Sequence, residues 1–189
     1  VVTLLAASLI ALLSFGVRAA FGLFTDPLTR DLGFPREVYA TAVALQNLLW
    51  GLAQPLAGIV ADRHGARRVL LLGATAYALG ILGMAFAATP LQLYLSVGVL
   101  AGLGMGGASF ITVLAALGRA MPASHRSWAL GLGTAAGSLG QFVVVPLVQA
   151  LIGLGGWRLG VEAMAAGIAA ILVVTWFVRG GQPAAQPAG

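Results

Sequence analysis

The sequence contains no cysteine and no lysine, and only 8% of its residues are charged. Without cysteine, the chain cannot form a disulfide, a thiolate metal site or a redox dithiol. The two histidines, His64 and His125, fall between apolar stretches with no second ligand at metal-binding spacing, so we expect no metal site. A nucleophile elbow, a zinc helix and a phosphate loop are also missing, which indicates that the chain is not an enzyme and predicts no cofactor.

Apolar residues fill the space that charge leaves. The hydrophobic fraction is 60% and the mean hydropathy is +0.99, far above the usual range for a soluble domain. Six apolar stretches of roughly 20 or more residues are each long enough to cross a hydrocarbon layer about 30 Å thick. We therefore predict an all-α membrane protein with a six-helix transmembrane bundle over residues 1–178. The predicted spans are Val1–Phe24, Val38–Val60, Val69–Ala88, Leu91–Leu117, Trp128–Leu154 and Trp157–Val178.

All ten basic residues are arginine, and their distribution predicts the orientation of the chain. Six arginines lie at one set of turns and three at the other, where Asp26, Asp31 and Glu37 partly balance them. The positive-inside rule then places both chain ends in the cytoplasm, with the bundle in the cell (inner) membrane. Because the arginines follow a membrane topology and not one face of a soluble fold, we reject nucleic acid as a partner. Residues 179–189, rich in Gly, Pro, Ala and Gln, are expected to start a flexible cytoplasmic linker.

The most specific motif lies between the second and third predicted spans, in the stretch Gly58–Arg68. Its glycines suit close helix packing and a positive φ in a cramped turn, its carboxylate can cap helix N-termini, and its arginines suit a cytoplasmic membrane surface. The spacing resembles the loop signature of the major facilitator superfamily of transporters, except that Ala66 stands where the family usually has its first basic residue. The matching residues, to which the resemblance assigns a gating role, are Gly58, Asp62, Arg63, Gly65, Arg67 and Arg68.

This resemblance implies a larger architecture than six helices. Family members usually have twelve helices in two six-helix bundles, so the chain is similar to an N-terminal half, built of two three-helix repeats. The resemblance implies secondary active transport of a small-molecule substrate across a lipid bilayer by alternating access, with a coupling proton or a counter-substrate. It also implies that the first and fourth helices line a central cavity and that the C-terminal six-helix half of the same transporter is a partner.

A second resemblance concerns the substrate. The stretch Phe15–Phe24 resembles the first span of bacterial carriers of the monocarboxylate and oxalate–formate type, which implies a small organic anion. Arg18 is the sole charged side chain deep within an apolar span, and its planar fork suits a carboxylate. Ser14 and Phe21 share its helical face, so we predict that these three residues bind substrate.

Other polar side chains within the spans are weaker candidates. Gln46, Trp50 and Gln54 are four residues apart on one face of the second span, and Ser109 supplies a hydroxyl in the fourth. We include these four among the predicted substrate-binding residues. Glu162 follows Arg158 by four residues, which predicts a local ion pair.

Two alternative functions stay open. A drug-efflux carrier of the same superfamily is disfavoured because Val145, and not glycine, precedes Pro146 in the fifth span. A membrane scaffold or assembly subunit that transports nothing is the other alternative. Gly98, Gly102 and Gly106 recur at four-residue steps, a pattern that favours close helix packing under any of these readings.

Overall fold

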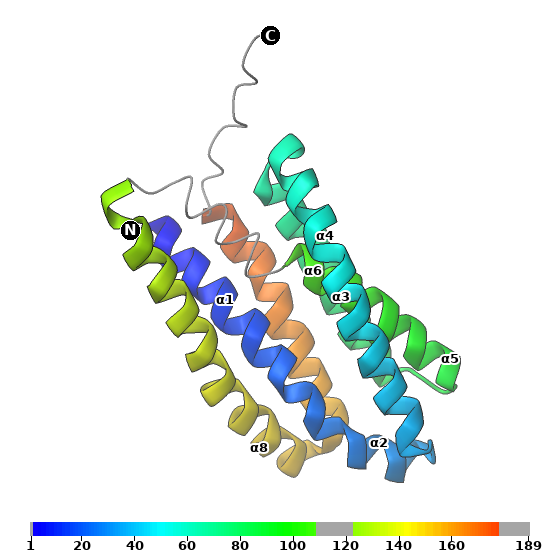
Figure 1. The fold of residues 1–189 in the computed structure, drawn as a ribbon. Coiled ribbons are helices and arrows are strands. Elements are labelled where there is room, and N and C mark those ends of the chain that lie inside the picture. Colours follow the sequence, from blue (N-terminus) through cyan, green and yellow to red (C-terminus); the bar gives the residue numbers. More distant parts are fainter. Residues whose placement is uncertain (1, 109–122, 178–189) are drawn as a thin grey trace.

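The computed structural model of the protein describes residues 2–108 and 123–177, which are entirely helical and contain no strand (Figure 1). Five helical stretches within this part of the chain are long and apolar enough to cross a membrane. The elements are α1 (Val2–Ala20), η1 (Phe21–Phe24), α2 (Thr25–Leu32), α3 (Arg36–His64), α4 (Ala66–Ala85), α5 (Pro90–Leu93), the π-helical η2 (Tyr94–Leu100), α6 (Ala101–Gly107), η3 (Ala123–His125), α8 (Arg126–Val174) and η4 (Thr175–Phe177).

The helix α8 is two membrane crossings joined by a break. Gly155 has φ −137° and ψ 16°, and Gly156 has φ 80° and ψ 173°, so the helical path is interrupted at these two residues. Figure 1 shows the two legs of α8 running in opposite directions on either side of this break. The described residues therefore supply the six crossings that the sequence predicts, with the glycine turn where it was expected.

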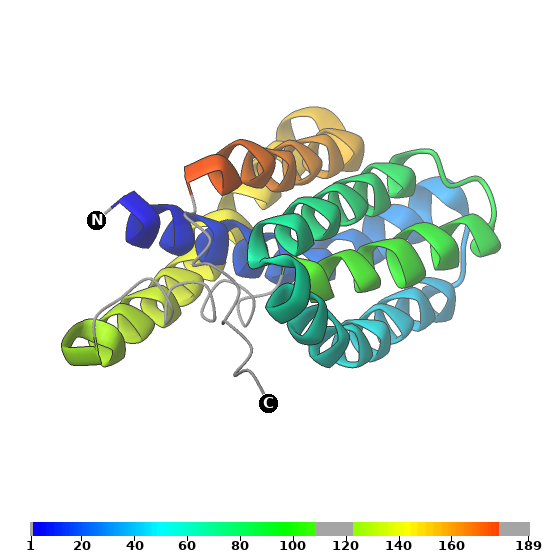
Figure 2. The same cartoon turned by 90° about the horizontal axis from the view of Figure 1, so that it is seen from above.

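The crossings form two groups of three that do not follow chain order (Figures 1 and 2). Helix α1 packs against both legs of α8, whereas the α5–η2–α6 crossing packs against α3 and α4. The first and fourth crossings have thus exchanged places between the first three and the last three. Contacts between α4 and α8 join the two groups.

Small residues permit the close approach inside the second group. A Cβ added at Gly98 would lie 2.8 Å from Leu45, one at Gly102 would lie 2.8 Å from the carbonyl oxygen of Gln46, and one at Gly106 would collide with Ala53. All three neighbours belong to α3, which confirms the packing role predicted for this glycine series.

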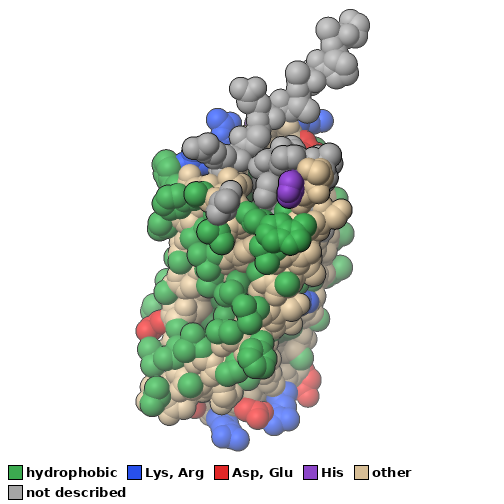
Figure 3. All heavy atoms as spheres, turned by 90° about the vertical axis from the view of Figure 1, so that its left-hand side faces the viewer, with side chains coloured by type: hydrophobic (Ala, Val, Ile, Leu, Met, Phe, Trp, Pro, Cys, Tyr) green, Lys and Arg blue, Asp and Glu red, His purple; other side chains and the backbone are tan. Residues whose placement is uncertain are grey.

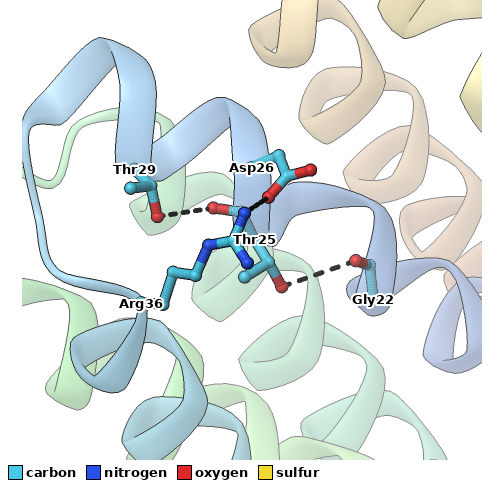
Figure 4. A network of polar contacts seen from close by, with 5 residues as sticks. All are labelled: Gly22, Thr25, Asp26, Thr29 and Arg36. Carbon is cyan, nitrogen blue, oxygen red and sulfur yellow. Dashed lines mark hydrogen bonds and ion pairs between the residues drawn. The ribbon is translucent and has the colours of Figure 1, made fainter.

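The connection between α1 and α3 differs from the expected loop. Residues 25–32 form the helix α2, in which the Thr29 hydroxyl donates to the Thr25 carbonyl oxygen at 2.8 Å (Figure 4). Arg36 pairs with Asp26 at 2.8 Å across this connection. Charged residues on a short amphipathic helix were taken as a loop because eight residues are too few for an apolar pattern to emerge.

Two other predictions at this end of the bundle were wrong. Trp157, expected to anchor a helix at the lipid interface, is 3% exposed and donates its indole N–H to Asp31 at 2.7 Å. Arg158 lies 4.7 Å from the ring centroid of Trp157, and no ion pair joins it to Glu162, although the structure describes both residues. The adjacent aromatic ring, within reach of Arg158, competes with the carboxylate one turn away.

The outer surface matches a membrane environment. Figure 3 shows hydrophobic side chains over the flank of the molecule, with most Arg, Asp and Glu side chains gathered at its two ends. Exposed leucines such as Leu72 and Leu154, at 72% and 82%, have no aqueous explanation. The apolar flank and charged ends together describe a multi-pass membrane protein.

Candidate functional site

The candidate site centres on Arg18, two residues before α1 ends and tightens into η1. Its Nη2 donates to the Asn47 side-chain oxygen at 3.0 Å, and its guanidinium carbon lies 4.4 Å from the ring centroid of Trp50. Asn47 and Trp50 are both on α3, one turn apart, so α3 presents an amide and an aromatic face to the same cation. The Asn47 amide is oriented by donating to the Val43 carbonyl oxygen at 2.8 Å.

Arg18 has no carboxylate partner. All five acidic residues of the chain lie in the described part, and none forms an ion pair with Arg18. Its Nε is buried and has no hydrogen-bond partner. A membrane-embedded cation without a counter-ion is costly, and the contact with Trp50 offsets that cost only in part.

Arg18 borders a cavity of about 20 Å³, which holds about one water-sized group. Four crossings contribute to its wall, including the first and the fourth as expected. The Ser14 hydroxyl donates to the Ala108 carbonyl oxygen at 3.2 Å and ties α1 to the end of α6 beside the cavity. The lining residues are Ser14, Phe15, Arg18, Trp50, Tyr77, Met105 and Ala108.

Tyr77 is the lining residue that the sequence did not single out. It is 1% exposed, and its hydroxyl is buried without a hydrogen-bond partner. A phenol in the middle of an apolar span was the available signal, because a buried tyrosine hydroxyl usually has a partner. Asn47 was noted only as a polar residue within a span; its contact with Arg18 joins two helices 29 residues apart in sequence.

The predicted substrate-binding residues divide in the structure. Ser14, Arg18 and Trp50 line the cavity. Phe21 is 2% exposed and stacks on Tyr77, with ring centroids 6.4 Å apart, behind the cavity wall.

The remaining predicted binding residues lie away from the cavity lining. Gln46 is 2% exposed, packs where α3 meets Gly102, and has an unpaired side-chain nitrogen. Gln54 is half-buried on the same helix, and Ser109 lies outside the described residues. The roles of these residues in binding stay predictions.

The predicted gating motif surrounds a single-residue turn, not a loop. Asp62 and Arg63 are exposed and still lie in the last turn of α3. Gly65 alone connects α3 to α4, with φ +89°, which confirms the positive φ expected there, and its N–H donates to the Ala61 carbonyl oxygen at 2.9 Å. The arginines beyond the turn diverge: Arg68 is exposed, whereas the Arg67 guanidinium carbon lies 4.0 Å from the ring centroid of Trp176.

One feature of this motif differs from the prediction. Gly58 was expected to permit close helix packing, yet a Cβ added there would meet no described atom within 4 Å. The face of α3 that carries Gly58 is therefore open among the residues that the structure describes. A glycine pattern predicts a smooth surface, but the sequence does not say which element covers it.

Known proteins resemble this chain in both sequence and fold. The family model described as Major Facilitator Superfamily matches residues 7–189. Mouse monocarboxylate transporter 11 is 31% identical over 146 residues, which cover 77% of this chain and 32% of that protein. Rat monocarboxylate transporter 3 is 33% identical over 149 residues, covering 78% and 30%. The resemblance to monocarboxylate carriers is thus confirmed, and the chain spans about a third of the length of these relatives.

Solved structures show the same fold at lower identity. The inward-open xylose transporter XylE from E. coli superposes with a TM-score of 0.79 at 17% identity, over 94% of this chain and 47% of that one. A peptide transporter POT mutant (E310Q) gives 0.76 at 21% identity, over 92% and 37%. The helical bundle is consistent with half of this fold, and proteins of this kind carry small molecules across a lipid bilayer and are not enzymes. The chain belongs to the Major Facilitator Superfamily.

Proposed function

We propose that the protein containing this chain carries a small organic anion, such as a monocarboxylate, by alternating access, and that Arg18 binds the carboxylate. The observation that carries the proposal is the cationic side chain of Arg18 beside a cavity, with none of the five carboxylates of the chain paired to it. The identity to monocarboxylate transporters 11 and 3 supports the same substrate class.

The hydrogen-bonding groups at the cavity favour an anion over a neutral solute. The Arg18 Nε–H is a buried donor without an acceptor, and the Tyr77 hydroxyl has a proton to donate and no partner. A carboxylate carries two acceptor oxygens and no donor, so it satisfies both groups and neutralises the cation. Trp50 faces the other side of the guanidinium and holds the fork in place.

The cavity of about 20 Å³ has room for a carboxylate group but not for a whole organic acid. In this proposal the rest of the substrate lies against the C-terminal six-helix half of the same transporter, which supplies the second wall. The coupling proton or counter-substrate is also assigned to the complete protein. The arginine distribution supports an inner-membrane orientation with both ends of this chain cytoplasmic.

We place gating at the turn between α3 and α4. Asp62, Arg63 and Arg68 are exposed at one end of the bundle, available to contacts that exist in only one state of the transport cycle. Arg67 stacks on Trp176 and links the start of α4 to η4. A charged turn fastened to two elements of this half is suited to latching against the other half.

Transport into proteoliposomes tests the proposal. Counterflow of labelled monocarboxylate should be abolished by Arg18→Ala and weakened by Arg18→Lys, which keeps the charge but loses the fork. Arg30→Ala is the matched control, because Arg30 is exposed on α2 and does not line the cavity. Normal affinity in Arg18→Ala would refute the role of Arg18.

The same assay separates the alternative functions. A scaffold shows no counterflow with any solute in the unmodified protein. A drug-efflux carrier transports organic cations and ignores monocarboxylates. Either result would overturn the proposed substrate class independently of the Arg18 variants.

A further inference from the structure

Glu162 occupies an unusual place for a carboxylate. It lies five residues into the second leg of α8, about 8 Å from Trp157 along the helix. Its side chain is exposed, and among the described residues none forms a hydrogen bond or ion pair with it. An ionisable side chain within a membrane crossing calls for a partner, and this chain supplies none for Glu162.

Glu162 stands at one end of a groove between α4 and the second leg of α8, away from the Arg18 cavity. The groove has a volume of about 370 Å³ and is otherwise lined by alanine, leucine and a single threonine. On α4 it follows residues 75, 78, 79 and 82, and on α8 residues 162, 165, 166, 169 and 172. Spacings of three and four mark one face of each helix, so the groove runs along the helix axes.

The dimensions of the groove limit what fits. From residue 162 to 172 it is about 15 Å long at 1.5 Å per residue, which leaves a mean cross-section of roughly 25 Å². A helix with a diameter of about 10 Å has a cross-section of roughly 80 Å² and is too wide. A single extended acyl chain is slender enough to lie in it, with alanines such as Ala166 and Ala169 making the floor shallow and smooth.

Charge at the mouth of the groove defines the head group. The Glu162 carboxylate calls for a cationic hydrogen-bond donor, and Arg158, exposed one turn nearer the end of the helix, calls for an anionic acceptor. A primary ammonium and a phosphate side by side meet both requirements. We propose that this groove binds a phosphatidylethanolamine, with one acyl chain between α4 and α8, its ammonium at Glu162 and its phosphate at Arg158.

Native mass spectrometry of the intact protein in detergent tests the site, with phosphatidylethanolamine and phosphatidylglycerol of identical acyl chains as probes. The unmodified protein should retain phosphatidylethanolamine in preference. Glu162→Gln should weaken its binding by about tenfold. Ala166→Leu, which fills the groove at an exposed position, should weaken it comparably through the acyl chain.

Two matched controls distinguish the groove from general lipid contact. Glu37→Gln removes an exposed carboxylate elsewhere, and Ala170→Leu enlarges an exposed alanine of the same helix that does not line the groove. Both should bind lipid as the unmodified protein does. Equal binding of the two lipids, or unchanged binding in Glu162→Gln, would overturn the proposal. A changed oligomeric state in Ala166→Leu without lipid loss would overturn it in favour of a second copy.

Discussion

Replacing Gly104 by alanine probes the packing that positions the candidate site. A Cβ on Gly104 would collide with the amide nitrogen of Tyr77 and lie 2.7 Å from its Cα. Both atoms are backbone, so no side chain can rotate away. To reach the 3.4 Å at which ordinary contact begins, α6 and α4 must separate by about 0.7 Å.

The magnitude follows from two opposing effects. Alanine gains about 1 kcal/mol over glycine in a helix interior, whereas overpacking costs about 1–3 kcal/mol. Gly131 in α8 is the matched control, since a Cβ there meets no described atom within 4 Å and the substitution keeps only the gain. We therefore expect Gly104→Ala to be less stable than Gly131→Ala by about 1–3 kcal/mol.

Unfolding by titration with a denaturing detergent measures this difference, with both variants compared under the same conditions. Monocarboxylate binding should also weaken in Gly104→Ala, because Tyr77 moves relative to Arg18. Equal stability of the two variants would refute the close approach of α6 to α4. Lost stability with unchanged binding would refute the link from this packing to the site.

Three further substitutions test other parts of the account. Asp62→Asn should slow transport with little change in substrate affinity; unchanged turnover together with a large loss of affinity, measured by counterflow, would contradict a gating role. Trp157→Phe should destabilise the bundle by about 1.5–3 kcal/mol by removing the hydrogen bond to Asp31, and additive effects with Asp31→Asn in a double-mutant cycle would show that the two do not interact. Gly65→Ala should cost roughly 1–2 kcal/mol because of its φ of +89°, whereas Gly58→Ala should leave the stability of this bundle intact when unfolding is followed in detergent.

Local features were the most predictable from sequence. The positive φ at Gly65 follows from a glycine in a one-residue turn, and the break at Gly155 and Gly156 from glycines between two long apolar runs. The packing of Gly98 against α3 follows from a small-residue series. In each case the physical cause lies within a few residues of the observed feature.

Contacts between distant elements were not predictable. Trp157 was expected at an interface because its carboxylate partner, Asp31, is 126 residues away. Arg18 was identified from its charge, but its neighbours Asn47 and Tyr77 came from α3 and α4, whose rotation about their axes sequence periodicity does not fix for largely apolar helices. The polar wall of the candidate site is therefore a product of tertiary packing.

The central claim is that Arg18 recognises a carboxylate by its charge and its fork. The most direct measurement compares counterflow of a monocarboxylate with that of its isosteric neutral amide, such as lactate against lactamide. Because hydrogen bonds to charged groups contribute about 1.5–3 kcal/mol, the unmodified protein should prefer the acid by about 10- to 100-fold, and Arg18→Ala should lose that preference. Retention of the preference in Arg18→Ala, with normal affinity for the acid, would contradict the account.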